Sequence, residues 1–188
     1  MTHSKIVDAG FIGILLLVAG GLIALACPRL YAHGGTISAE HILWNINQET
    51  LSPGAPQVDR ARTAFLESSA LGVDSSYFFI REGASLFTQL NSVDEAHLPQ
   101  SLSSLRKTYT SVLSLRPMYG PAWPRLAMAS LRQETDRAES IRFLTAAYIV
   151  GPQDFRLRVM RVWVALRMWE DLGEDMRRNV RHDVQVLW

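Results

Sequence analysis

The stretch AGFIGILLLVAGGLIALACP, from Ala9 to Pro28, contains no charged residue. As a helix rising 1.5 Å per residue it would be about 30 Å long, which matches the hydrocarbon core of a bilayer. Inside lipid such a segment must satisfy its own backbone hydrogen bonds, and a single segment does so only as a helix. The sequence therefore predicts one transmembrane helix within an anchor region 1–33, contact with the lipid bilayer through residues 9–28, and a folded domain over residues 34–188.

Two other interpretations of this segment remain open. Lys5 precedes the apolar run and Ala24-Leu25-Ala26 resembles a signal-peptide cleavage site. Leu25-Ala26-Cys27 also resembles a lipoprotein box that would lipidate Cys27, although Ala24 is smaller than the residue usual three positions before that cysteine. The apolar run is longer than a typical signal core, which favours an uncleaved anchor.

The charges that flank the apolar run give a weak orientation signal. Lys5 is offset by Asp8 on one side, and Arg29 lies on the other. A short N-terminal flank before a single anchor usually stays in the cytoplasm. We therefore expect a single-pass protein of a bacterial inner membrane with its C-terminal domain in the periplasm.

Charge is unevenly distributed along a chain whose net charge is only +1. Residues 34–99 carry three basic and eight acidic side chains, whereas residues 100–188 carry fourteen basic and nine acidic ones. The small net charge argues against a nucleic-acid partner. The asymmetry is compatible with self-association, but an ordinary solvated surface is the preferred interpretation.

Known catalytic and metal-binding motifs are missing from the sequence. The five histidines share no metal-ligand spacing, and Cys27 is the one cysteine. The sequence has no His-Glu-x-x-His pattern, no Gly-rich phosphate loop and no Gly-x-Ser-x-Gly turn. The sequence therefore predicts that the protein is not an enzyme and that it has no catalytic residue, no metal ligand and no cofactor. A site assembled only in the folded chain is the remaining alternative.

Gly, Pro and polar clusters divide the chain into amphipathic helices rather than strands. We expect His33-Gly34-Gly35 to end the membrane helix and Ser38 to cap a short helix through Ile46. The further expected helices run from Asp59 to about Leu71, Tyr77–Leu90, Leu98–Leu115, Pro121–Leu131, Asp136–Val150 and Asp154–Leu172, with a last one around Met176 to Leu187. The apolar stripe of the penultimate expected helix should face the core, and so should two further tryptophans, Trp44 and Trp123. The stripe consists of Phe155, Val159, Val162, Trp163, Leu166 and Trp169. The fold class is all-α, and the short connections favour antiparallel neighbours.

One segment has the period of a helical repeat. Pro117 and Pro152 are 35 residues apart, and residues 118–152 between them read MYGPAWPRLAMASLRQETDRAESIRFLTAAYIVGP. With a one-residue insertion between its two helices, this unit resembles a tetratricopeptide repeat. The residues that match the pattern are Trp123, Leu126 and Ala127 in the first helix and Ser140, Leu144 and Ala147 in the second.

The resemblance implies a right-handed stack of helical hairpins whose first helices line a groove for a partner protein. Carried over to this chain, the partner-binding positions are Arg125, Met128 and Arg132. The two arginines would suit a carboxylate or an acidic segment, or would simply be solvated surface residues.

The overall plan, one anchor followed by a short helical-repeat domain, also resembles the VpsP-like accessory proteins of bacterial polysaccharide biosynthesis and export. The residues that carry this likeness are Leu115-Arg116-Pro117 with Trp123, and Gly151-Pro152 leading into Val162-Trp163 and Leu166. It implies an adaptor or scaffold that binds the membrane proteins of one assembly. The alternative is an accessory structural subunit of a respiratory or transport complex, held mainly through its transmembrane helix.

Overall fold

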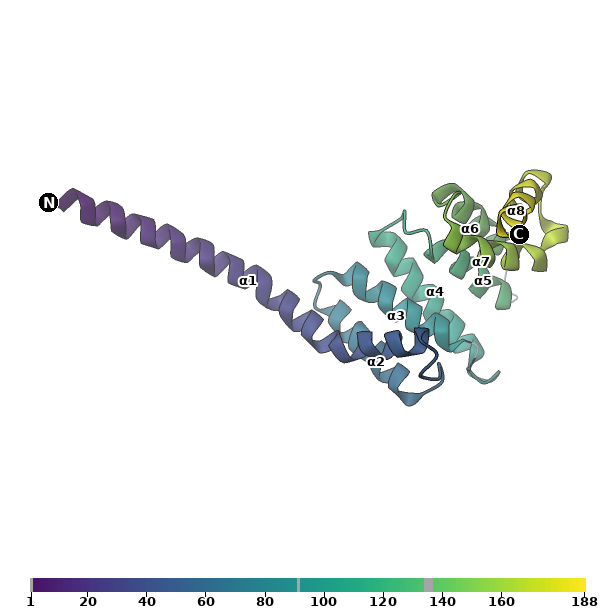
Figure 1. Cartoon of the computed structure of the whole chain (residues 1–188), viewed down its shortest axis with the longest axis horizontal. Helices are drawn as coiled ribbons and strands as arrows, with labels where there is room; N and C mark the ends of the chain where they lie inside the picture. Colours follow the sequence, from purple (N-terminus) through teal and green to yellow (C-terminus); the bar gives the residue numbers. More distant parts are fainter. Residues whose placement is uncertain (1, 91, 134–136) are drawn as a thin grey trace.

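The chain is helical throughout the part that the structure describes, residues 2–90, 92–133 and 137–188, with side chains from Gly13 onward (Figure 1). In this computed structural model those residues form eight α-helices and one short 3-10 helix, with no strand among them. The elements are α1 (Thr2–Asn47), α2 (Pro56–Ala70), α3 (Ser75–Gln89), α4 (Leu98–Leu115), α5 (Ala122–Arg132), α6 (Arg137–Val150), α7 (Phe155–Arg167), η1 (Trp169–Asp171) and α8 (Glu174–Leu187). The all-α prediction is confirmed.

Helix α1 projects from the domain as a long rod (Figure 1). Among the described residues it is the one helix long and apolar enough to cross a membrane. Its apolar side chains from Ile14 to Leu25 are exposed, as a lipid-facing helix requires. The structure therefore agrees with the predicted single apolar N-terminal helix. The side of the membrane on which the domain lies stays a prediction.

The expected break at His33-Gly34-Gly35 is wrong, because α1 continues without interruption to Asn47. Each glycine costs a helix only about 1 kcal/mol relative to alanine. One face of the C-terminal half of α1 is buried at a spacing of three and four residues: Ala32, Thr36, Ala39, Leu43 and Ile46. That burial against α2 and α3 outweighs the cost of the two glycines, so Ser38 caps no separate helix.

Several helix boundaries differ from the expected ones by a few residues. Helix α2 begins at Pro56 rather than near Asp59, because proline suits the first helical position. Helix α7 ends at Arg167 and is followed by η1, so the expected helix to Leu172 is too long. The expected start of the sixth domain helix at Asp136 and the turn residue Asn91 lie outside the described residues. Trp44 is exposed rather than part of the core.

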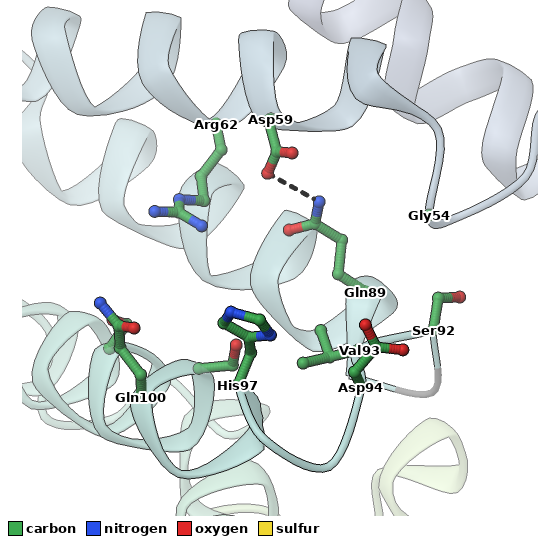
Figure 2. Close-up of a pocket in the computed structure, with 11 residues that line it drawn as sticks. Gly54, Asp59, Arg62, Gln89, Ser92, Val93, Asp94, His97 and Gln100 are labelled. Carbon is green, nitrogen blue, oxygen red and sulfur yellow. Dashed lines mark hydrogen bonds between the residues drawn. The ribbon is translucent and has the colours of Figure 1, made fainter.

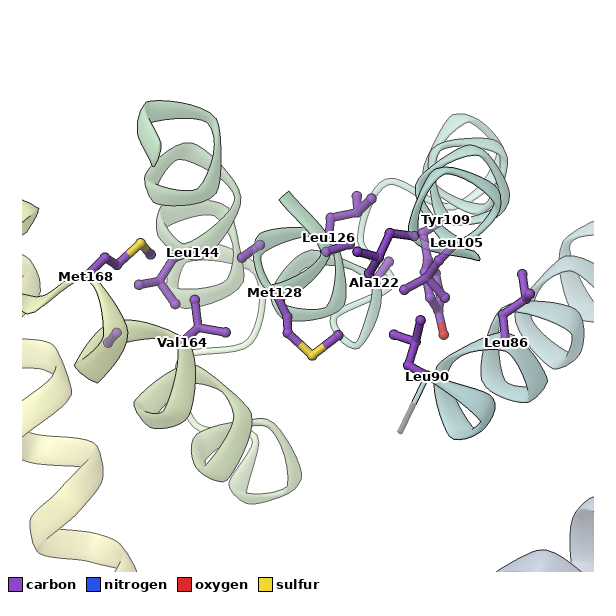
Figure 3. Close-up of a cluster of buried hydrophobic side chains, with 14 of the residues drawn as sticks. Leu86, Leu90, Leu105, Tyr109, Ala122, Leu126, Met128, Leu144, Val164 and Met168 are labelled. Atoms are coloured by element: carbon purple, nitrogen blue, oxygen red, sulfur yellow. The ribbon is translucent and has the colours of Figure 1, made fainter. Parts of the chain in front are cut away.

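Each helix of the domain packs against the next one in sequence, and α5 also packs against α7. Two apolar cores result. The smaller joins the C-terminal half of α1 to α2 and α3 and contains Val58, Phe65 and Phe78. The larger runs from Leu86 on α3 through Leu126 on α5 to Val164 on α7, and Figure 3 shows its side chains as a continuous row between these helices.

Helices α3 and α4 approach closely at Gly83. The buried Tyr109 ring lies so near that a Cβ added at Gly83 would come 2.9 Å from its Cζ atom. One residue earlier, the buried Glu82 carboxylate accepts a hydrogen bond of 3.2 Å from the Thr108 hydroxyl. Burial raises the pKa of Glu82. At the α3–α4 contact, a glycine thus permits the close approach of Tyr109, and beside it lies a buried carboxyl group whose ionisation is unfavourable.

We expect Gly83→Ala to destabilise the domain by about 1–3 kcal/mol, because overpacking cancels the usual gain from removing a helical glycine. The matched control is Gly35→Ala on α1, where a Cβ meets no atom within 4 Å. That control should stabilise the chain by up to about 1 kcal/mol. Urea unfolding of the full-length chain in mild detergent, followed by circular dichroism at 222 nm, measures both. Equal shifts of the same sign would contradict the close approach.

Glu82→Gln should raise the melting temperature at pH 7. Because the folded pKa of Glu82 is raised, its stabilising contribution is fully present below the ordinary pKa of about 4.3 and is lost as the pH rises through the folded pKa. Glutamine keeps the acceptor for Thr108 and stays neutral at every pH. The difference from wild type should therefore vanish near pH 3.5. The exposed Glu95→Gln control should show no such pH-dependent gain.

Candidate partner-binding groove

A groove of about 410 Å³ lies between α3, α5 and α7. It is lined by Phe87 and Leu90 from the end of α3, by Met128 and Arg132 from α5, and by Arg156, Val159, Met160 and Trp163 from α7. Its walls are mostly apolar, with two guanidinium groups among them. Such a surface suits an amphipathic segment better than a small polar molecule.

The structure brings two of the three predicted partner-binding residues together in this groove. Met128 and Arg132 both line it, four residues apart on α5. Arg125, one further turn away, is not among the lining residues. Their role in binding a partner stays a prediction.

Arg125 is instead held between α3 and α4. Its Nη1 donates a hydrogen bond to the Tyr109 hydroxyl, and its guanidinium carbon lies 4.9 Å from the centre of the Phe87 ring and 5.4 Å from that of Tyr109. Burial raises the pKa of Tyr109 to about 12, so this phenol remains protonated at neutral pH. Arg125 therefore positions Phe87, which is itself a wall of the groove.

The prediction for the apolar stripe of residues 155–169 is wrong for half of its members. Val162, Trp163 and Trp169 are half-buried and pack against the larger core, as expected. Val159, expected in the core, is 62 % exposed, and Phe155 and Leu166 are exposed as well. The side chains that face inward are Leu157, Val164 and Ala165 together with two arginines, Arg158 and Arg161. Part of the apolar stripe, Val159 and Trp163, thus faces the groove.

An ion pair between α7 and α8 explains this orientation. Arg161 and Asp183 are 0 % and 1 % exposed, and Nε and Nη2 of Arg161 donate to the two carboxylate oxygens of Asp183 at 2.9 and 3.0 Å. Arg161 also donates to the carbonyl oxygens of Gly151 and Pro152, and its guanidinium lies 4.4 Å from the centre of the Tyr148 ring. A buried charge is tolerated only with such partners.

Neither cation beside the groove has a buried acidic partner among the described residues. Arg132 makes no ion pair with any residue that the structure describes. Arg156 pairs only with its near neighbour Asp154, at 3.3 Å, in a solvent-exposed contact of little strength. The groove thus combines an apolar surface with two positive charges.

A second hollow of about 410 Å³ opens between α2 and the start of α4. Figure 2 shows Arg62 on α2 and His97 beside α4 facing it from opposite sides, with the Gln89 amide donating to the Asp59 carboxylate at 3.0 Å. Its lining is polar and mostly exposed. Nothing in its lining anchors an apolar segment, so we favour the α3–α5–α7 groove.

No group of three or more metal-ligating side chains gathers among the described residues. Comparison of the chain with the models of known protein families, with curated proteins and with solved structures finds no match. The candidate site therefore depends on geometry alone.

The α7 residues of the groove were missed by sequence reasoning. Arg156, Val159, Met160 and Trp163 belong to a helix whose apolar stripe was assigned to the core. The available signal was Arg158 and Arg161, spaced three apart on the other face and followed by an acidic residue on the next helix. A pair of arginines in a helix otherwise rich in apolar residues does not by itself reveal that it is buried.

Asp183→Asn should destabilise the domain by about 3 kcal/mol or more, because it leaves the buried Arg161 charge without its carboxylate. The control is Asp175→Asn on the same helix, whose 3.5 Å pair with Arg178 is exposed. That change should stay within about 0.5 kcal/mol of wild type. Urea unfolding of full-length chains compares them. A loss from Asp183→Asn as small as that of the control would refute the role of the ion pair.

Proposed function

We propose that this protein is a membrane-anchored helical adaptor that binds an acidic, amphipathic segment of a partner protein in the groove between α3, α5 and α7. The observation that carries the proposal is the outward orientation of α7. A helix that buries two arginines while exposing Val159 has an apolar surface without an internal partner.

The order of packing supports a repeat-like interpretation of the domain. Antiparallel pairs α3/α4 and α5/α6 follow one another, and α5 packs against α7 two helices later. Alternate helices of a tetratricopeptide stack line its groove, and the groove of this chain is lined by residues of α3, α5 and α7. We propose on this basis that the hairpins stack as in the tetratricopeptide family.

The chemistry of the partner follows from the groove. Phe87, Met128 and Trp163 offer apolar and aromatic contacts of the kind that dominate binding energy. Arg132 and Arg156 would pair with carboxylates of the bound segment. The anchor limits candidates to proteins at the same membrane. Polysaccharide biosynthesis or export is the pathway that the resemblance suggests, and it stays a prediction.

The test is co-purification of the full-length chain from its native membrane in mild detergent, with quantitative mass spectrometry of the proteins recovered. Val159→Glu should reduce the recovered partner at least about tenfold, the equivalent of about 1.4 kcal/mol, because it places a carboxylate in the groove. The matched control is Ile149→Glu on α6, which changes an apolar residue that is also exposed but lies outside the groove. Equal recovery with both variants would overturn the groove proposal.

An anchor exchange distinguishes the second candidate, an accessory subunit held through its transmembrane helix. Residues 9–28 are replaced by an unrelated apolar helix of equal length, and the same recovery is measured. Binding through the groove survives the exchange, whereas binding through α1 is lost.

A further inference from the structure

The domain contacts α1 at residues 29–33, within two helical turns of the predicted membrane boundary at Pro28. Asp74, in the turn between α2 and α3, lies 3.6 Å from Nε of Arg29 and 3.4 Å from Nε2 of His33. The Ser68 hydroxyl donates to the Ala32 carbonyl oxygen at 3.2 Å, and the His33 ring packs 5.1 Å from that of Phe78. The α2–α3 turn is thus fixed beside residues 29–33.

The length of α1 places this turn relative to the bilayer, on the premise that Ala9–Pro28 spans it. Pro28 then marks the edge of the hydrocarbon core, and His33 lies five residues, or about 7.5 Å, beyond it. The headgroup layer on each side of a bilayer is about 5–8 Å thick. The turn therefore lies at the height of the lipid headgroups. Figure 1 shows it on the side of the domain from which α1 emerges.

Three side chains at this height are apolar and exposed. Leu30 is 71 %, Tyr31 76 % and Leu71 45 % exposed, and all three line one hollow of about 550 Å³ that includes Gly34 and Gly35. Tyrosine is enriched at membrane interfaces, where its ring meets lipid and its hydroxyl meets water. We call Leu30, Tyr31 and Leu71 the juxtamembrane face.

We propose that the juxtamembrane face rests in the headgroup layer of the bilayer that α1 spans, so that the domain contacts the membrane through α2 as well as through its anchor. No excess of positive charge lies beside it, because Arg29 and His33 face Asp74 and the exposed Glu67 lines the same hollow. The contact is therefore apolar, and neutral phosphatidylcholine is sufficient for it. The domain does not swing on a flexible tether, so in a bilayer of a given thickness it has one orientation to the membrane surface.

The test uses single fluorescent labels and lipid quenchers. Cys27, the one cysteine of the sequence, is changed to serine, and one cysteine at a time is introduced by Leu17→Cys, Tyr31→Cys, Leu71→Cys, Ile37→Cys or Met118→Cys. Each native side chain at these positions is exposed, so each label is tolerated by the fold. The full-length chain is placed in phosphatidylcholine vesicles with nitroxide either on the headgroup or deep in the acyl chain.

Headgroup nitroxide should quench the Leu71 label as strongly as the Tyr31 label and more strongly than the labels at Ile37 and Met118. The label at Leu17 should lose most fluorescence to the deep nitroxide. A deep Leu17 label together with a Leu71 label that behaves like Met118 would overturn the docked orientation while leaving the anchor intact. A Leu17 label that the deep nitroxide fails to quench would overturn the anchor and the docking with it. Neither result bears on the groove, which the co-purification tests separately.

Discussion

The Arg161–Asp183 ion pair determines which face of α7 is buried in the domain. Two hydrogen bonds to the carboxylate, two backbone carbonyls and an aromatic ring surround one guanidinium. Because that charge can be buried only where all these partners meet, it fixes the rotation of α7 about its own axis. Phe155, Val159 and Leu166 are consequently left exposed, whereas Val162 and Trp163 keep a half-buried contact with the core. This rotation of α7 forms the groove, because it places Val159 and Trp163 along one of the groove walls.

A similar balance explains the continuity of α1. Gly34 and Gly35 weaken the helix locally, yet the buried row from Ala32 to Ile46 lies across them. The Thr36 hydroxyl, which donates to the His33 carbonyl at 3.0 Å, adds a local bond at the same place. Tertiary packing therefore decides a conformation that local propensity alone would leave open. Anchor and domain therefore share one helix, which continues through Pro28 as well as through the two glycines.

The sequence predicts well those parts of the fold that depend on residues close together in the chain. The apolar run from Ala9 to Pro28, the prolines that end helices and the short connections yield the helix order with small errors at the ends. The prediction fails where two patterns compete. At residues 33–35 a glycine pair competes with a buried seam, and on α7 an apolar stripe competes with buried arginines. In both places the outcome depends on residues distant in sequence, Ser68 for α1 and Asp183 for α7. The groove followed the same rule, since the predicted residues Met128 and Arg132 both lie on α5, whereas the orientation of its α7 wall depends on α8.

The unbroken course of α1 has a consequence for membranes of different thickness. A transmembrane helix that is too long for a bilayer tilts to bury its apolar length. In a protein whose anchor is joined to its domain by a flexible linker, the domain would not follow the tilt of the anchor. Here the same helix forms part of the domain core, so a leaning anchor inclines the whole domain by the same angle. Local bilayer thickness would then set the direction in which the groove opens, and lipid composition would decide which neighbours can reach it.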